Sequence, residues 1–183
     1  RSPGVFFSQS EHPNGTPLYS ARIIPFRGSW VEFTTDVNDI MYVYIDRKKK
    51  FPVTMLLRAI NYSSDEEIIN LFDLSETIEL NKDGKALALG RTLAKDVVDT
   101  ETGEIVAEQG VIVDEEVLIA CKKNKIKEID VIIAIDPSSP NVILNTIKKD
   151  TTKSEEQAVE AIYRQLRSGE PPDIDTARSL IER

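Results

Sequence analysis

The sequence predicts an α+β fold, in which an antiparallel sheet packs with helices and is interrupted by a small β-rich inserted module. Two observations predict it: apolar and polar side chains alternate over residues 18–46, and capped helical segments flank a stretch, 83–135, with a different pattern. A run of strands followed by a run of helices is typical of α+β domains. The composition, with 40% hydrophobic and 30% charged residues, is ordinary for a globular protein of 183 residues.

The alternation divides residues 30–46 into two faces. One face carries Val31, Phe33, Met41, Val43 and Ile45, and the other carries Trp30, Glu32, Thr34, Tyr42, Tyr44 and Asp46. A period of two predicts strands of an antiparallel sheet. Arg27-Gly28-Ser29 is expected to turn the first strand pair, because glycine tolerates the positive φ that a tight reversal often needs.

Helix signals follow the strands. Pro52 suits the first turn of a predicted helix over 52–60. Ser64-Asp65-Glu66-Glu67 is a capping box that predicts a second helix, with its apolar side chains turned inward. Those inward side chains are expected to be Ile68, Leu71 and Phe72.

The last third of the chain is expected to rejoin the first sheet and then to become helical. Residues 142–147 are predicted to form a strand of that sheet. Ser154-Glu155-Glu156-Gln157 is another capping box, and a final helix is expected from about Asp173. The helix after Ser154 would turn one face inward, made of Ala158, Ala161, Ile162 and Leu166.

The pattern changes between residues 83 and 135. A turn at Glu101-Thr102-Gly103, a strand over 104–107 and a short helix capped by Asp114 predict a self-contained module. On this interpretation, residues 1–82 and 136–183 form one discontinuous domain into which 83–135 is inserted. Pattern alone leaves an alternative open, in which 83–135 is the middle of one continuous domain.

Charge and length exclude several functional classes. No apolar run is long enough to span a bilayer, and the single Cys121 permits no internal disulfide, as in a reducing cytoplasm. The net charge of −8 argues against a nucleic-acid binder. However, residues 1–62 hold 8 Lys and Arg against 5 Asp and Glu, so any contact with DNA is expected mainly there. Because the chain lacks an initiator Met and stops inside a predicted helix, we expect an excised fragment of a longer polypeptide.

The residues that could carry catalysis are few. His12, the only histidine, lies in a turn rich in Pro, Asn and Gly, and no nucleophile elbow accompanies it. Cys121 is expected to be a small buried side chain beside Leu118. No zinc-ligand spacing or phosphate loop is present. A hydrolase using His12 is therefore poorly supported.

Trp30 and the basic run after Asp46 have two interpretations each. Trp30, the only tryptophan, falls on the polar face, where either an unpaired nucleotide base or a second layer of protein could cover it. Arg47-Lys48-Lys49-Lys50 is either a solvated strand end or a patch that faces phosphates. Lys48, Lys49 and Lys50 are thus candidates for phosphate contact.

Several segments, in order along the chain, resemble bacterial RNA polymerase beta subunits where the protrusion meets the lobe. They are Arg1-Ser2-Pro3-Gly4-Val5-Phe6-Phe7, followed by 18–30, then Ile45-Asp46-Arg47-Lys48-Lys49-Lys50-Phe51-Pro52, Leu56-Leu57-Arg58-Ala59-Ile60-Asn61-Tyr62 and 162–172. The resemblance implies the lobe domain, with residues 1–20 bordering the protrusion. Residues 90–104 are similar to the sandwich-barrel hybrid modules inserted in many polymerase subunits.

The resemblance also implies a DNA site. In this family, single-stranded non-template DNA enters a pocket between lobe and protrusion, whose residues fall on Arg1, Trp30, Asp46, Arg47 and Arg167. Trp30 would stack on a base, and Arg1 would lie near a guanine. Arg47 and Arg167 would meet phosphates or bases, while Asp46 would hold a guanidinium or accept a base hydrogen bond.

The function implied is that of a non-catalytic jaw of DNA-directed RNA polymerase, a nucleotidyltransferase of the cytoplasm and nucleoid. The expected partners are non-template DNA near the downstream edge of the bubble and the other polymerase subunits, with no membrane. No cofactor is expected in this fragment, since another subunit of the family enzyme binds Mg²⁺. An alternative is a protein-docking module, in which the insert receives a transcription factor through acidic residues around Asp99, Glu101, Glu104 and Glu108.

Overall fold

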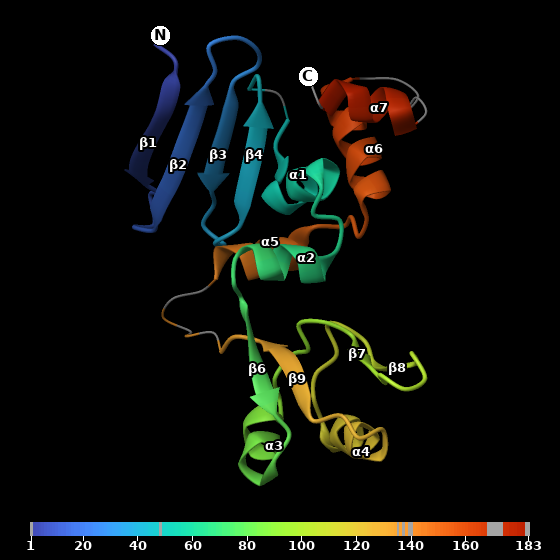
Figure 1. Cartoon of the computed structure of the whole chain (residues 1–183). Helices are drawn as coiled ribbons and strands as arrows, with labels where there is room; N and C mark the ends of the chain where they lie inside the picture. The colour runs from blue at the N-terminus through green and yellow to red at the C-terminus, as the bar shows by residue number, and fades with distance from the viewer. Residues whose placement is uncertain are drawn as a thin grey trace. The chain divides into compact units, whose positions relative to one another are not determined.

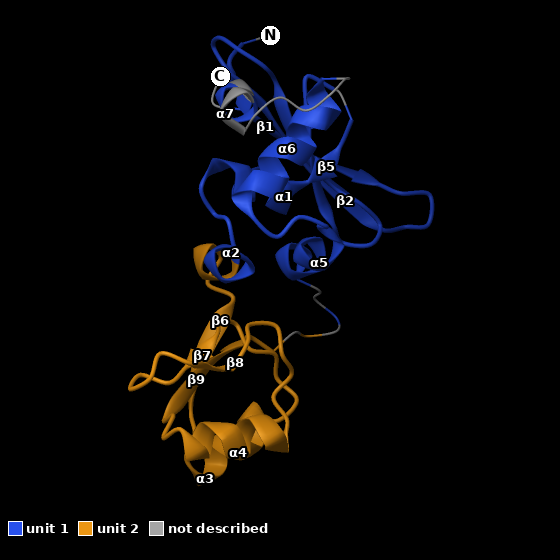
Figure 2. Ribbon diagram, turned by 90° about the vertical axis from the view of Figure 1, so that its right-hand side faces the viewer, with its two compact units in different colours: residues 1–68, 137–183 blue, residues 69–136 orange. Residues whose placement is uncertain are grey.

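The chain forms two compact units, each with its own core. The structure, a computed structural model, describes residues 2–47, 49–134, 136, 138, 141–167 and 174–181. The first unit comprises residues 1–68 and 137–183, and the second comprises residues 69–136 (Figure 2). The predicted insert, 83–135, lies within the second unit, which begins at Ile69.

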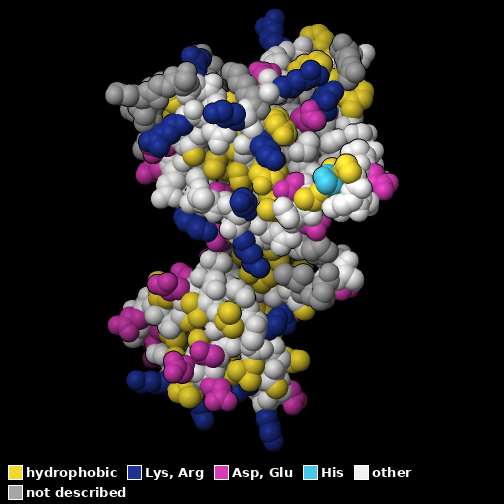
Figure 3. Space-filling model, turned by 180° about the vertical axis from the view of Figure 1, so that it is seen from behind, with side chains coloured by type: hydrophobic (Ala, Val, Ile, Leu, Met, Phe, Trp, Pro, Cys, Tyr) yellow, Lys and Arg dark blue, Asp and Glu magenta, His cyan; other side chains and the backbone are white. Residues whose placement is uncertain are grey.

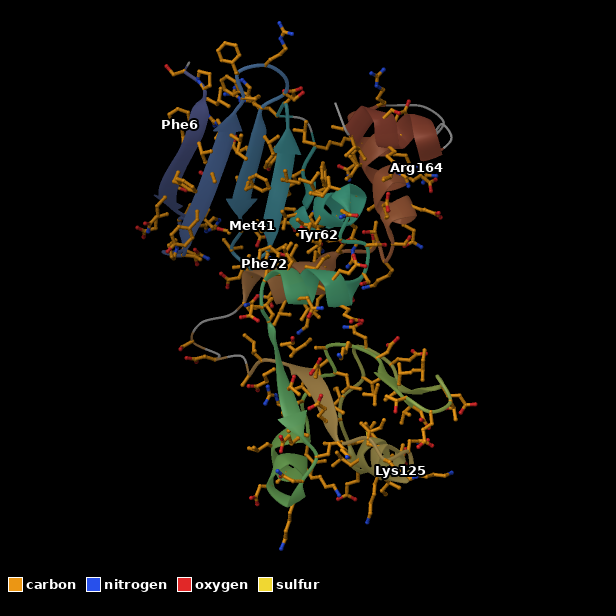
Figure 4. All side chains as sticks on the ribbon, in the orientation of Figure 1. Phe6, Met41, Tyr62, Phe72, Lys125 and Arg164 are labelled. Atoms are coloured by element: carbon orange, nitrogen blue, oxygen red, sulfur yellow. The ribbon has the colours of Figure 1, made fainter. Side chains whose placement is uncertain are left out.

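The first unit is built on a five-stranded antiparallel sheet in which sequence neighbours pair (Figure 1). Its strands are β1 (Gly4–Glu11), β2 (Pro17–Ile24), β3 (Val31–Thr35), β4 (Met41–Ile45) and β5 (Phe51–Pro52). The strands predicted within 18–46 are confirmed. Strand β1 was not predicted, because Val5, Phe6 and Phe7 are consecutive apolar residues that give no alternation. It is an edge strand, and Phe6 lies at the outer side of the sheet (Figure 4).

One face of the sheet packs against helices α1 (Val53–Ile60), α6 (Glu155–Leu166) and α7 (Ile174–Ile181). Val31, Phe33, Val43 and Ile45 meet the helices on this face, as the alternation predicts. The buried members of the core are Val43, Phe51, Met55, Ala59, Ala158, Val159, Ile162 and Ala177. The opposite face therefore carries Trp30 and the alternate residues of β3 and β4.

Helix α2 (Asp65–Leu71) begins at the predicted cap, but the side chains that it buries differ from those predicted. The hydroxyl of Ser64 accepts a hydrogen bond from the Glu67 N–H at 3.2 Å. Ile68 is fully buried, as predicted, whereas the predictions for Leu71 and Phe72 are wrong, since these residues are 42% and 41% exposed. The helix ends at Leu71 and the chain reverses at Asp73 (φ 54°), so Leu74 rather than Phe72 enters the interior.

The predicted strand over 142–147 is wrong, because these residues belong to helix α5 (Val142–Lys149). The side chain of Asn141 caps it by accepting a hydrogen bond from the Leu144 N–H at 3.1 Å. Leu144 and Ile147, three residues apart, are both buried, which is a helical spacing. The Thr146 hydroxyl accepts a hydrogen bond from the Met41 N–H at 3.0 Å, which joins α5 to β4.

The second unit is mixed α and β rather than β-rich. Strand β6 (Ser75–Glu79) pairs with β9 (Glu128–Ile132), and β7 (Val97–Val98) pairs with β8 (Ile105–Ala107), both antiparallel. Helix α3 (Lys82–Ala88) starts at the Asn81 cap, and α4 (Glu115–Lys123) starts at the predicted Asp114 cap. The core consists of Ile78, Ala88, Leu93, Val97, Val113, Cys121, Ile129 and Val131.

Candidate nucleic-acid interface

Trp30 is fixed to Asp46 where β3 begins and β4 ends. The Trp30 N–H donates to Asp46 Oδ1 at 3.0 Å, and the Asp46 N–H donates to the Trp30 carbonyl at 2.9 Å. These two bonds extend the β3–β4 pairing by one residue pair beyond Val31 and Ile45. Asp46 therefore holds the backbone of Trp30. The contact with a guanidinium or a base that the resemblance implies for Asp46 stays a prediction.

Two arginines lie over the half-buried indole of Trp30. The guanidinium carbons of Arg22 and Arg47 lie 5.9 and 5.8 Å from the ring centroid. Arg22 also donates from Nε and Nη2 to Glu32 Oε2, at 3.2 and 3.1 Å, so its charge is matched by a carboxylate. A ring with cations at its face can attract further π systems and phosphates at the same point.

The backbone at Asp46 and Arg47 is unusual. Both residues have positive φ values, 51° and 58°, in the left-handed region that residues with a Cβ seldom occupy. Such a conformation costs about 1–2 kcal/mol per residue, and Asp39, Asn61, Asp73 and Lys125 also have positive φ values. The turn places Arg47 beside Trp30 while Asp46 keeps its hydrogen bonds to the same residue.

A cleft of about 810 Å³ opens beside this turn, within the first unit. Its apolar lining includes Val31, Ile45, Leu56, Ile162 and Leu166, and its polar lining includes Arg27, Ser29, Asp46 and Arg167. The cleft thus brings together Asp46 and Arg167, which are far apart in the sequence. Trp30 is not part of the lining. Its side chain is on the outer face of the sheet, so the predicted site has two parts joined by Asp46.

Besides Arg47, which lies over Trp30, the basic run contributes Lys50 to an aromatic contact. Lys50 Nζ lies 4.3 Å from the centroid of the Tyr42 ring, and both Lys49 and Lys50 are exposed. Arg1 and Lys48 lie outside the described residues. In Figure 3, Lys and Arg side chains lie among hydrophobic and acidic ones over the first unit.

Three residues on the face of Trp30 were not named from the sequence as candidates for a DNA site: Arg22, Tyr42 and Tyr44. Strand alternation places both tyrosines on the face of Trp30, so the signal was present. Arg22 could not be recognised, because its position over the indole depends on the β2–β3 register that pairs it with Glu32.

Two other reactive side chains of the described residues are His12 and Cys121. His12 lies in a turn closed by the His12 N–H and the Thr16 carbonyl at 2.9 Å. Cys121 is fully buried, and burial raises the pKa of its thiol, which disfavours the reactive thiolate. Over the described ranges, no group of three His, Cys, Asp or Glu residues could hold a metal ion. In the same ranges, none of the helices has the length and apolar character to cross a membrane.

Comparison with known proteins gives a family and close relatives. The family described as RNA polymerase Rpb2, domain 2, matches residues 1–95. The chain is 49% identical to the DNA-directed RNA polymerase subunit beta of Cytophaga hutchinsonii, over 99% of this chain and 15% of the relative. It is 50% identical to the subunit of the same name from Bacteroides thetaiotaomicron, over 99% of this chain and 16% of the relative. The chain therefore spans about one sixth of the length of these curated relatives.

Proposed function

The chain belongs to the family of RNA polymerase Rpb2, domain 2, and on that premise we propose that it acts within the beta subunit of a bacterial DNA-directed RNA polymerase. Its role there is to form one jaw of the DNA cleft and to hold single-stranded non-template DNA. The observation that carries this proposal is Trp30, fixed through Asp46 and flanked by Arg22 and Arg47.

The physical argument rests on the two kinds of interaction that single strands offer. Stacking of a base on an aromatic ring contributes about 1–3 kcal/mol and tolerates any sequence. Arg47 and Arg167 supply charge for phosphates, and the cleft beside Asp46 offers room for a base or sugar. Arg1, expected near a guanine, would add base discrimination.

Within the polymerase, this chain is assigned no chemical step. The nucleotidyl transfer and its Mg²⁺ belong to another subunit, and the residues described here hold and orient DNA. The partners are DNA and the other polymerase subunits, in the cytoplasm at the nucleoid.

The test uses the single tryptophan as its own reporter. Because Trp30 is the only Trp, quenching of its fluorescence by oligothymidylate measures stacking at this position alone. Quenching should saturate with single-stranded DNA at low salt and weaken steeply as salt rises. Arg47→Ala and Arg167→Ala should weaken it several-fold. Arg164→Ala is the matched control, since Arg164 is exposed and pairs with Glu160 on the outside of α6. Equal losses in all three variants, or no quenching, would contradict the proposal.

A second candidate, a docking role for the second unit, is favoured by its exposed β7–β8 hairpin. Ile105 is 55% exposed and is followed by Glu108, with Glu101 and Glu104 preceding it on the surface. Asp99 is different, because it is buried and its Oδ1 accepts the Glu101 N–H at 2.8 Å, so it holds the turn. In the intact beta subunit, Trp30→Ala should weaken open promoter complexes under the first proposal. Removal of 85–135 should matter more under the second.

A further inference from the structure

The outer face of the sheet carries the aromatic side chains of Trp30, Tyr44 and Tyr42. Asp46 lies opposite Trp30, Tyr44 opposite Glu32, and Tyr42 opposite Thr34. Trp30, Tyr44 and Tyr42 therefore share one face, opposite to the face that Val43 and Ile45 bury against the helices. Both tyrosines are only partly buried.

Cations accompany this row at both ends. Arg22 and Arg47 lie over Trp30, and Lys50 lies over Tyr42 at the far end. The two tyrosines are spaced by the strand, because Tyr42 and Tyr44 are two residues apart on β4. Their Cα atoms are therefore about 6.6–6.8 Å apart. The cations are therefore distributed along the row rather than gathered at one point.

Acidic groups on this face are largely engaged. The Glu32 carboxylate is occupied by Arg22, and Asp46 Oδ1 by the Trp30 N–H. Asp36, near Tyr42, accepts the N–H groups of Asn38 and Ile40 at 2.9 and 3.0 Å. Burial, with the Asp36 carboxylate and Tyr44, raises the pKa of Tyr42, so its phenol stays neutral.

We propose that the row Trp30, Tyr44 and Tyr42 is one stacking track for single-stranded DNA, with Lys50 binding a phosphate at its far end. Sheets that bind single strands use the same device, in which aromatic residues on adjacent strands stack successive bases. An arriving base displaces the cation from the ring face, and the displaced ammonium or guanidinium stays within reach of that nucleotide's phosphate. The track would bind the same single-stranded DNA that the proposed function holds at Trp30, so this inference rests on that function.

The experiment separates the track from the Trp30 site by oligonucleotide length. The chain is titrated with a thymidine dinucleotide and a hexanucleotide, following Trp30 quenching and, with end-labelled DNA, fluorescence anisotropy. The double variant Tyr42→Leu, Tyr44→Leu should lose at least about fivefold in hexanucleotide affinity, because one stacked base or more is lost. Its dinucleotide affinity and quenching should stay unchanged. Tyr42→Phe with Tyr44→Phe should restore hexanucleotide binding, since phenylalanine also stacks.

Tyr19→Leu is the matched control, because Tyr19 is an exposed tyrosine of strand β2 on the opposite face of the sheet. Equal hexanucleotide affinity in the double variant and in Tyr19→Leu would overturn the track and leave the Trp30 site standing. If the dinucleotide did not quench Trp30 fluorescence in the unsubstituted chain, the proposed function itself would be contradicted. A chain that bound neither oligonucleotide at low salt would overturn both, and so would a preference for duplex DNA of the same length.

Discussion

Arg58 and Asp150, 92 residues apart in the sequence, form an ion pair that is closed off from water. Arg58 Nε lies 3.2 Å from Asp150 Oδ2, and both side chains are 0% exposed. Asp150 also accepts the Thr54 hydroxyl at 2.7 Å and the Thr152 N–H at 2.9 Å. The pair ties helix α1 to the residue that follows α5, so the returning part of the chain is locked onto the first part of the same unit.

Replacing Arg58 with methionine should therefore be strongly destabilising. The substitution leaves the Asp150 carboxylate buried without its charged partner, which costs about 3–5 kcal/mol. Urea unfolding followed by Trp30 fluorescence reports on this unit, which contains the only tryptophan. Arg164→Met, in an exposed pair with Glu160, should cost less than about 1 kcal/mol. Similar losses for the two variants would refute the assigned role of the buried pair.

Gly84 should not tolerate alanine, although it lies in helix α3. A Cβ added at Gly84 would lie 1.7 Å from the Glu79 carbonyl oxygen, so the backbone would have to move. Alanine is normally better than glycine in a helix by about 1 kcal/mol. We expect Gly84→Ala to destabilise the second unit instead, by about 1–3 kcal/mol. Thermal unfolding by circular dichroism tests this, with Asp83→Ala, an exposed neighbour, as control. A Gly84→Ala chain that melts at or above the unsubstituted one would contradict it.

Asp130 should give the second unit a stability that is lost in acid. Burial alone would raise the pKa of Asp130, but the Thr77 hydroxyl at 2.6 Å and the Lys95 ammonium at 3.0 Å lower it. The folded state therefore binds the proton less readily than the unfolded state. The stabilisation is present above the unfolded pKa of about 4 and disappears as the pH falls through the lower folded value.

Urea unfolding at a series of pH values tests this sign with Asp130→Asn. The unsubstituted chain should be the more stable of the two near neutral pH, and the difference should shrink as the pH falls below about 4. Thr77→Val removes one of the two partners of Asp130. Its stability should also approach that of the unsubstituted chain as the pH falls, but from a smaller difference at neutral pH. A difference that stays constant with pH would show that Asp130 contributes by packing alone.

Local signals in the sequence predicted much of the fold because their partners are near in the chain. Strands β3 and β4 follow from a period of two, and the caps Ser64, Asp114 and Ser154 each bond to an N–H three residues later. The strand predicted over 142–147 was wrong because the Asn141 cap and the helical spacing of Leu144 and Ile147 were overlooked.

Long-range partners could not be predicted. Arg58 and Arg22 are unremarkable as single residues, and their roles depend on Asp150, Glu32 and the indole of Trp30, which the fold brings near. The candidate DNA residues came from a resemblance, and their part in binding stays a prediction. The structure adds that Asp46 and Arg167 line one cleft, whereas Trp30 lies on the outer face of the sheet.

Asp46 should affect DNA binding through the backbone of Trp30 rather than by touching DNA. Its Oδ1 accepts the Trp30 N–H at 3.0 Å, an interaction that asparagine can keep and alanine cannot. Asp46→Ala should release Trp30, shift its emission toward that of a solvated indole and weaken oligothymidylate binding, while Asp46→Asn should preserve both. The loss of a carboxylate by itself would strengthen binding to an anion in both variants equally. If Asp46→Asn weakened binding as much as Asp46→Ala, the carboxylate charge, and not its hold on Trp30, would be the property that DNA requires.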